Sequence, residues 1–438
     1  MAIFSPQTVK AIRSRFWYVA EDSGGRSRIF FDNAAGSLVL KRAHAVIEQY
    51  ARLSSYGGGY FPDASVVDHL MERARQSVAT LLNAPSPASI FTGESATAVL
   101  KRLAEAILPS LPDGSTLIVS ATDHNANIDP WRRMAEQLAS KRFDVKQVTF
   151  SPTTGTADLD HLESLLDEHV GLVAVSHASN VLGAENPIVE IRHLLDQKAP
   201  EALLIVDGVH FIPHGPADVQ ALGVDAYVFS SYKIFAQRGT CFAYASDRVL
   251  RLPHYRLTPA PDAPPESWEW GFRNPADLAP IAEVVQYLAW LGQRCFPSAS
   301  TEDRRDLQQC VRRGQTAIRQ YEHELVRAML DGVGHTPGLL AIDGITVYGA
   351  QHPTTIHLKE PTFSFNIKGL PSDNVEKILW DQYRIAVRAG DHYARETLNH
   401  LGITDCVRAS LAHYNTIEEV EKFLMAVQQI ARHEHRRR

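Results

Sequence analysis

The chain has 438 residues, 45% of them hydrophobic, and its 44 basic and 50 acidic side chains give a net charge of −6. This composition is typical of a globular protein with a large core and two domains, and it does not favour nucleic-acid binding. No apolar run is long enough to span a membrane, and the N-terminus lacks the apolar segment of a signal peptide.

The first half of the chain, residues 30–245, alternates short apolar runs with amphipathic segments. The predicted strands cover residues 89–93, 115–121, 170–178, 202–209 and 226–231, and the predicted helices between them cover 95–108, 128–140 and 159–170. Runs that are apolar on both faces indicate buried strands, and their alternation with helices predicts a mostly parallel sheet. Sites on such sheets gather at the carboxyl ends of the strands.

The second half begins with a proline- and aromatic-rich stretch, residues 252–275, in which we expect no regular structure. Helices are predicted over 276–295, 302–330, 372–382 and 416–432, and a strand over 362–369. Thr416 and Glu419 have the spacing of a capping box at the start of the last helix. This mixture predicts a smaller α+β domain.

Two chemically distinctive residues follow the last buried runs. Asp207 comes directly after four apolar residues, and Lys233 follows the strand predicted over 226–231. A carboxylate at the end of a buried strand needs a partner. An aspartate and a lysine at neighbouring strand ends suit pyridoxal 5′-phosphate (PLP): the lysine forms a Schiff base and the aspartate pairs with the pyridinium nitrogen. A plain ion pair explains these two residues alone equally well.

Other strand ends carry polar residues that fit the same cofactor. His124 follows the strand over 115–121, where an imidazole can lie flat on a planar ring, and Asn180 follows the strand over 170–178, where its amide suits a phenolic oxygen. Ser95 and Thr97 open a helix whose backbone N–H groups can bind phosphate. Taken singly, each has a structural alternative as an N-cap, a turn residue or a loop amide.

With these residues in place, the chain resembles a fold-type I PLP enzyme of the class V aminotransferase family, on the cysteine desulfurase and selenocysteine lyase branch. The resemblance covers nearly the whole chain, in the motifs FFDNAAGS, DHNANIDPW, SNVLGAENP, VDGVH, FSSYK, VRAGDHY and VRASLAHYNTIEEVEKF. It implies a homodimer. It also implies a large domain of residues 29–285 with a mostly parallel sheet of the seven-stranded type, and a small α+β domain of residues 1–28 and 286–438.

The resemblance also implies roles for residues that match the family's motifs. Lys233 would bind the cofactor covalently, Asp207 would pair with its pyridinium nitrogen, and His124 would stack on its ring. Asn180 would contact the 3-oxygen or the substrate. His210 stands where the family often has a glutamine near the phenolic oxygen.

The same resemblance implies which residues bind the cofactor phosphate and which bind the substrate. The implied phosphate-binding residues are Ser95, Ala96, Thr97, Ser230 and Tyr232. The implied substrate-binding residues are Arg408, Asn180, Arg388 and Asn33. The guanidinium fork of Arg408 would bind the substrate carboxylate. A surface salt bridge is the alternative for Arg408.

The sequence departs from the family at the loop that carries a reactive cysteine in desulfurases. In VRAGDHYARE, Arg388 and Gly390 are present, but Tyr393 stands where the cysteine would be. A phenol with a pKa near 10 does not accept sulfur as a thiolate does. Tyr393 either donates a proton to a departing thiolate or packs the loop.

A second departure lies in EWGFRNP. The family commonly has a small hydroxyl residue after this glycine, which reaches the phosphate of the neighbouring subunit; here Phe272 and Arg273 follow it. We expect Arg273 to supply this contact, with loss of the contact as the alternative.

The cysteines and histidines add further expectations. Cys241, Cys295, Cys310 and Cys406 lie far apart and off the loop, and the nineteen histidines show no metal-ligand spacing. We therefore expect the protein to reside in the reducing cytoplasm and to have neither a disulfide framework nor a bound metal.

Chemistry at the α-carbon of an amino acid is what remains. We expect β-elimination from cysteine or a cysteine S-conjugate without persulfide formation, a C–S lyase reaction in which Lys233, His124 and Tyr393 take part. Relatives of this kind that lack the cysteine include such lyases. Aminotransferase or epimerase activity is the alternative. A further alternative, from a different class of function, is a non-catalytic protein with this fold that binds an amino acid.

Overall fold

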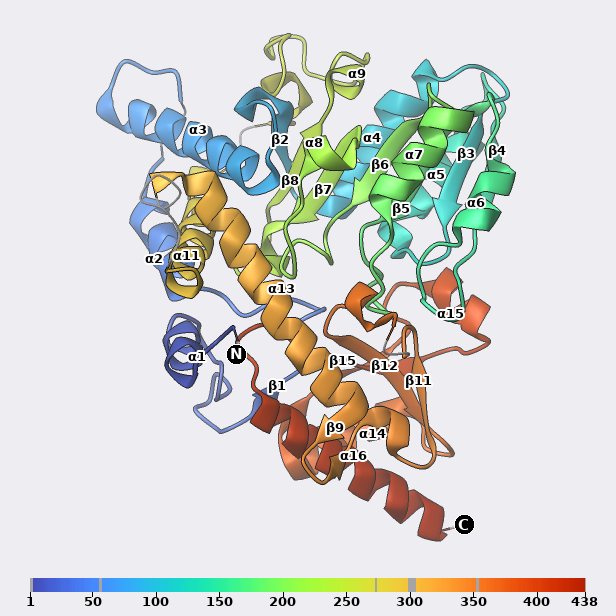
Figure 1. Cartoon of the computed structure of the whole chain (residues 1–438). Coiled ribbons are helices and arrows are strands. Elements are labelled where there is room, and N and C mark those ends of the chain that lie inside the picture. Colours follow the sequence, from blue (N-terminus) through green and yellow to red (C-terminus); the bar gives the residue numbers. More distant parts are fainter. Residues whose placement is uncertain (1–2, 55–56, 272–273, 298–304, 352–353, 438) are drawn as a thin grey trace.

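A seven-stranded sheet forms the centre of the larger part of the molecule (Figure 1). The computed structural model describes residues 3–54, 57–271, 274–297, 305–351 and 354–437. The strand order is β2-β8-β7-β6-β5-β3-β4. All neighbouring pairs are parallel except those of β8, which is antiparallel to both β2 and β7. The strands are β2 (Ile90–Gly93), β3 (Thr116–Ser120), β4 (Asp144–Val148), β5 (Val170–Ser176), β6 (Leu203–Asp207), β7 (Ala226–Ser230) and β8 (Cys241–Ala245).

Helices cover both faces of this sheet, because its strands are apolar on both sides. Along β6, Leu203 and Ile205 belong to one hydrophobic cluster, and Leu204 and Val206 belong to the other. The connecting helices are α4 (Ala96–Ser110), α5 (Asp129–Gln137), α6 (Leu159–Leu165), α7 (Ile188–Lys198), α8 (Val219–Leu222) and α9 (Asp247–Leu250). The predicted α/β fold with a mostly parallel sheet is confirmed.

A group of helices joins this layer to the C-terminal part. It consists of α2 (Lys41–Tyr50), α3 (Pro62–Leu82), α10 (Pro275–Leu278), α11 (Pro280–Cys295) and the long α13 (Leu307–Asp331). α11 and α13 pack closely, because a Cβ at Gly292 would lie 2.0 Å from the carbonyl oxygen of Cys310, and one at Gly314 would lie 2.0 Å from that of Leu288. The predicted domain boundary between residues 285 and 286 falls within α11.

The C-terminal part holds an antiparallel sheet in the order β11-β12-β15-β14 (Figure 1). Its strands are β11 (Ile345–Tyr348), β12 (Thr362–Ile367), β14 (Arg388–Gly390) and β15 (Cys406–Ser410), and its helices are α14 (Ser372–Tyr383), α15 (Arg395–Leu401) and α16 (Ile417–Arg437). Short strands β9 (Gly332–Val333) and β10 (Thr336–Pro337) pair with each other. The capping box is present: Glu419 N–H donates to Thr416 Oγ1 at 3.2 Å, and Thr416 N–H donates to Glu419 Oε2 at 3.1 Å.

The N-terminal segment belongs with the C-terminal part. α1 (Pro6–Arg13) is tied to α16 through Arg13 and Glu419, whose charged atoms lie 2.9 Å apart. β1 (Ile29–Phe30) pairs in parallel with β13 (Ile385–Ala386). Among the described residues, none of the helices has the length and apolarity that crossing a bilayer requires.

Candidate active site

A cavity of about 430 Å³ opens at the carboxyl ends of β5, β6 and β7, against β14 and β15. The structure brings most of the predicted site residues together around it: Ser95, Ala96, Thr97, His124, Asn180, Asp207, His210, Ser230, Tyr232, Lys233, Arg388, Tyr393 and Arg408. Those that follow strands of the large sheet converge because parallel strands end at the same edge, and Arg388, Tyr393 and Arg408 are contributed by the C-terminal part.

Asp207 and Lys233 stand on neighbouring parallel strands. Asp207 ends β6, and Lys233 lies in the 3₁₀ turn Ser231–Lys233 that follows β7. Burial, reinforced by the charge of Arg408, lowers the pKa of Lys233 to about 7. Burial raises the pKa of Asp207 to about 6, although its Oδ1 accepts a hydrogen bond from the N–H of Val209 at 2.9 Å. About half of the lysine is therefore available as a neutral nucleophile near pH 7, and the aspartate needs a cationic partner.

The start of α4 forms the polar end of the cavity. Ser95 caps the helix, and its Oγ accepts a hydrogen bond from the N–H of Ala98 at 3.2 Å. The N–H of Ala96 donates to Oγ of Ser230 at 3.3 Å, so the loop after β2 and the end of β7 meet here. A helix N-terminus with hydroxyls around it binds an anion through its N–H groups and its dipole.

His124 lies between the cavity and the loop after β14. Its Nδ1 accepts a hydrogen bond from the N–H of Ala126 at 3.0 Å, and burial lowers its pKa to about 4, so the ring is neutral. It stacks on Tyr393 with ring centroids 5.6 Å apart. Tyr393 is 72% exposed, and both it and His392 have left-handed backbone conformations, with φ of 54° and 53°. Two such consecutive residues that are not glycine store strain of the kind found at functional sites.

Two arginines share one carboxylate beside the cavity. Arg388 donates to Oδ2 of Asp32 at 2.6 and 3.1 Å, and Nη2 of Arg408 lies 3.8 Å from Oδ1 of the same residue. Nη1 of Arg408 also donates to the backbone oxygen of Asn180 at 3.0 Å. Burial lowers the pKa of Arg408 to about 10, which leaves it charged at neutral pH. A surface salt bridge does not describe Arg408, because its side chain is only 5% exposed.

Among the predicted site residues, Asn33 does not line the cavity and Arg273, like Phe272, falls outside the described part of the chain. Nδ2 of Asn33 donates to the backbone oxygen of Ser410 at 2.9 Å, and its Oδ1 accepts from the hydroxyl of Tyr414. Its amide therefore joins the N-terminal segment to β15. Sequence reasoning missed the neighbour Asp32, which belongs to the same motif FFDNAAGS and pairs with Arg388 and Arg408.

His210 lines the cavity and reaches away from it toward β12. Its Nε2 lies 3.1 Å from Oγ1 of Thr362 and 3.4 Å from a carboxylate oxygen of Glu360. Burial lowers the pKa of His210 far below its usual value.

The residues present fit PLP. The anion site at α4, the lysine at η3 (Ser231–Lys233) and the carboxylate at the end of β6 supply the partners for its phosphate, aldehyde and ring nitrogen. One buried side-chain atom is also free to bind a ligand: Oδ1 of Asn180 has no hydrogen-bond partner among the described residues. Nδ2 of the same residue donates to the backbone oxygen of His392 at 2.9 Å.

The fold and this cavity define a PLP-dependent enzyme of fold type I. The model of the aminotransferase class-V family matches residues 29–255 and 307–423, and the chain belongs to this family. The family resemblance, the fold class and the PLP cofactor expected from the sequence are thereby confirmed.

Relatives carry the name cysteine desulfurase. A probable cysteine desulfurase of Mycolicibacterium paratuberculosis is 31% identical over 97% of this chain, which spans 58% of that protein's length. The cysteine desulfurase of Klebsiella pneumoniae is 28% identical over 97% of this chain and 98% of its own. Two solved structures show the same fold. The cysteine desulfurase of Thermococcus onnurineus NA1 has a TM-score of 0.78 and 24% identity, over 92% of this chain and 95% of its own. That of Escherichia coli has a TM-score of 0.77 and 23% identity, over 96% and 98%.

Proposed function

We propose that the protein cleaves the C–S bond of cysteine or a cysteine S-conjugate by β-elimination, without passing the sulfur to a cysteine of its own. One observation carries the proposal: the cavity holds the groups needed at the α-carbon, but no cysteine is among the described residues that line it. The coarser function, that of a PLP-dependent class V enzyme, follows from family membership.

When bound, PLP withdraws electrons from the α-carbon of an attached amino acid. Arg408, charged and buried, binds the substrate carboxylate and orients the α-carbon toward Lys233. Lys233, whose pKa is about 7, takes the α-proton. The Cβ–S bond then breaks with its electron pair on sulfur, which is protonated at the cavity mouth beside Tyr393. The remaining three-carbon enamine takes up water to give pyruvate and ammonia.

The cysteines are placed where they do not relay sulfur. All four lie within the described residues and none lines the cavity. Cys406 comes closest in sequence to the site, two residues before Arg408 on β15, but it is fully buried and burial raises its pKa to about 11. A thiol in that state is a poor nucleophile, since the thiolate is the reactive form.

Cysteine desulfurase activity is the second candidate, favoured by the names of the relatives. It cleaves the same bond but leaves alanine and a protein persulfide, so the products separate the two. Aminotransferase and epimerase activities break no C–S bond. A protein that binds an amino acid without turnover has no use for a lysine with a lowered pKa at the cavity.

The test is product analysis with the PLP-loaded protein and L-cysteine. We expect pyruvate, ammonia and sulfide in equal amounts, no persulfide on any protein peptide by mass spectrometry, and full activity in a Cys406→Ser variant. Alanine with a protein persulfide would establish the desulfurase. A sulfur-containing keto acid or D-cysteine would establish the aminotransferase or the epimerase, and absence of turnover would leave the binding protein.

We also propose a homodimer located in the cytoplasm. An exposed apolar surface, with Tyr255 65%, Leu257 54% and Trp270 36% exposed, lies on the proline-rich stretch and reaches the segment WEWGFRNP, which the family resemblance places near the partner's phosphate site. The four cysteines are free thiols, which suits a reducing compartment. Sedimentation should give twice the chain mass, and charged replacements of Tyr255 and Leu257 should give monomers. A fully active wild-type monomer would contradict the dimer.

A further inference from the structure

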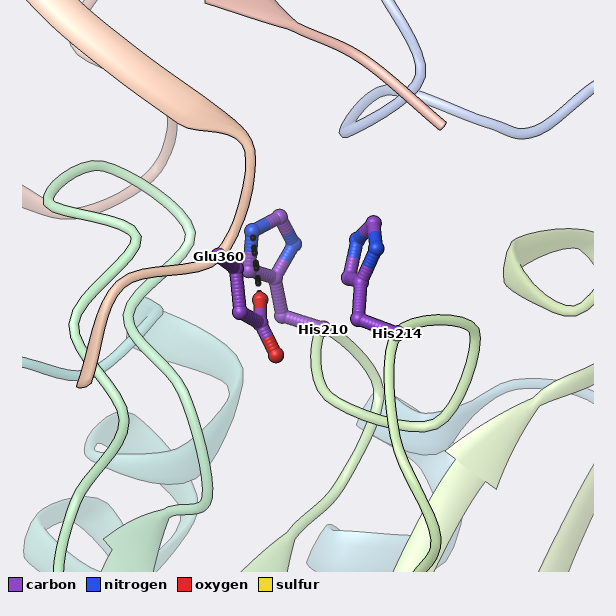
Figure 2. A group of neighbouring side chains, drawn as sticks. All are labelled: His210, His214 and Glu360. Atoms are coloured by element: carbon purple, nitrogen blue, oxygen red, sulfur yellow. Dashed lines mark ion pairs between the residues drawn. The ribbon is translucent and has the colours of Figure 1, made fainter. Parts of the chain in front are cut away.

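We propose that His210, His214 and Glu360 bind a divalent cation behind the wall of the PLP cavity. Figure 2 shows the carboxylate of Glu360 beside the imidazole of His210, with His214 next to it on the same loop. Each residue offers one ligand atom, these atoms all lie within 4.8 Å of one another, and all three residues are buried. This goes beyond the proposed function, which assigns the cluster no role.

The fold brings these side chains together from distant parts of the sequence. His210 and His214 stand in the loop after β6, and Glu360 stands in the segment that enters β12 (Figure 2). Two imidazoles and one carboxylate form a ligand set typical of first-row divalent cations such as zinc. Bonds of about 2.1 Å to such an ion would draw the three groups slightly closer together.

The carboxylate of Glu360 is the independent observation that calls for a cation. Glu360 is 2% exposed, and neither of its oxygens has a hydrogen-bond partner among the described residues. The nearby cations are engaged elsewhere: Arg319 pairs with Glu185 at 2.5 Å, and Lys359 donates to the backbone oxygen of Leu182 at 2.7 Å. A buried carboxylate without hydrogen bonds is destabilising unless a charge compensates it.

His214 is already held as a metal-binding histidine would be. Its Nδ1 lies 2.8 Å from Oε2 of Glu322, which is itself buried. This contact fixes the ring and leaves Nε2 as the ligand atom, the carboxylate–histidine–metal arrangement seen at zinc sites. The Nε2 atom of His210, now beside Thr362 and Glu360, would face the same ion. Because His210 also lines the cavity, the ion would fix one side chain of the cavity wall.

The experiment is a titration of the chelator-treated, PLP-loaded protein with Zn²⁺ by calorimetry and with Co²⁺ by visible absorption. We expect one ion per chain, with the cobalt bands of a site that has nitrogen and oxygen ligands. Glu360→Gln and His214→Gln should abolish stoichiometric binding. Glu322→Gln, which removes only the outer carboxylate, should weaken it by about 10–100-fold. His254→Gln, at a half-buried histidine outside the cluster, should bind as the wild type does.

The wild-type titration decides the matter even if a variant fails to fold. Wild-type protein that takes up no stoichiometric Zn²⁺ or Co²⁺ overturns the site, as does a folded Glu360→Gln variant that binds with unchanged affinity. Neither readout uses turnover. Failure of the cation site and failure of the C–S lyase proposal are therefore separate results.

Discussion

Replacement of Arg408 by lysine tests whether this buried guanidinium binds the substrate carboxylate. Nη1 of Arg408 is committed to the backbone oxygen of Asn180, and Nη2 is 3.8 Å from Asp32, which leaves the guanidinium able to hold a carboxylate with a second nitrogen. Lysine keeps the charge but loses the fork. The loss of one charge-assisted hydrogen bond, about 1.5–3 kcal/mol, should lower kcat/KM by about 10–140-fold.

Arg388 is the matched control, because it pairs with the carboxylate of Asp32, as Arg408 does, but from a more exposed position. Its side chain is 52% exposed, against 5% for Arg408. Exposed ion pairs contribute about 0.2–1 kcal/mol, so Arg388→Lys should lower kcat/KM by at most about fivefold.

The assay compares binding of S-methyl-L-cysteine with that of S-methylcysteamine, which lacks the carboxylate, through the absorbance of the bound cofactor. Arg408→Lys should weaken binding of the amino acid and leave binding of the amine unchanged. Equal weakening of both ligands, or equal effects of the two arginine variants, would refute the assignment.

Three further predictions concern the cavity. Borohydride reduction of the PLP-loaded protein should place the pyridoxyl mass on the peptide that contains Lys233, and a label on another lysine would contradict that assignment. Because the pKa of Lys233 is about 7 in the folded chain, the unfolded chain binds the extra proton between about pH 7 and its ordinary pKa, so this group makes the apoprotein more stable as pH rises through that range. Denaturant titrations from pH 7 to 9 should therefore show a smaller rise in Lys233→Met; an equal rise would refute the lowered pKa. Finally, Tyr393→Phe should change kcat by less than about tenfold.

The fold was predictable where strands are buried on both faces. The runs that became β2, β3, β5, β6 and β7 were recognised because they are continuously apolar, but β4 and β8 were missed. β4 (Asp144–Val148) pairs with β3 alone and carries polar, partly exposed residues, so its sequence lacks the buried pattern. β8 (Cys241–Ala245) is fully buried and apolar, so its sequence carries the same signal as the recognised strands, whereas its antiparallel pairing with β2 and β7 depends on contacts far apart in the sequence.

Contacts between distant parts of the sequence also limited the prediction of the site. Residues that directly follow parallel strands were predictable, since the topology brings them to one edge of the sheet. The roles of Asp32 and Asn33 were not, because they depend on the pairing of Asp32 with Ser410 beside β15, which decides the neighbour of each side chain. In the cluster of His210, His214 and Glu360, the two histidines have the four-residue spacing of metal ligands, but Glu360 is contributed by a distant segment, so the sequence does not show the complete ligand set.

Tyr393 separates two accounts of how sulfur leaves. A phenol acting as the acid would have to be held toward the reacting atoms and shielded from water, and its removal should then lower kcat and kcat/KM together by about 10²-fold or more. The structure favours packing instead, because Tyr393 is 72% exposed and its ring lies on His124 with centroids 5.6 Å apart. Water at an open mouth can protonate the sulfur without the hydroxyl. Phenylalanine keeps the ring contact and should therefore retain activity, whereas Tyr393→Ala loses it and should mainly raise KM. A drop in kcat of about 10²-fold in Tyr393→Phe alone would show that the hydroxyl is the acid.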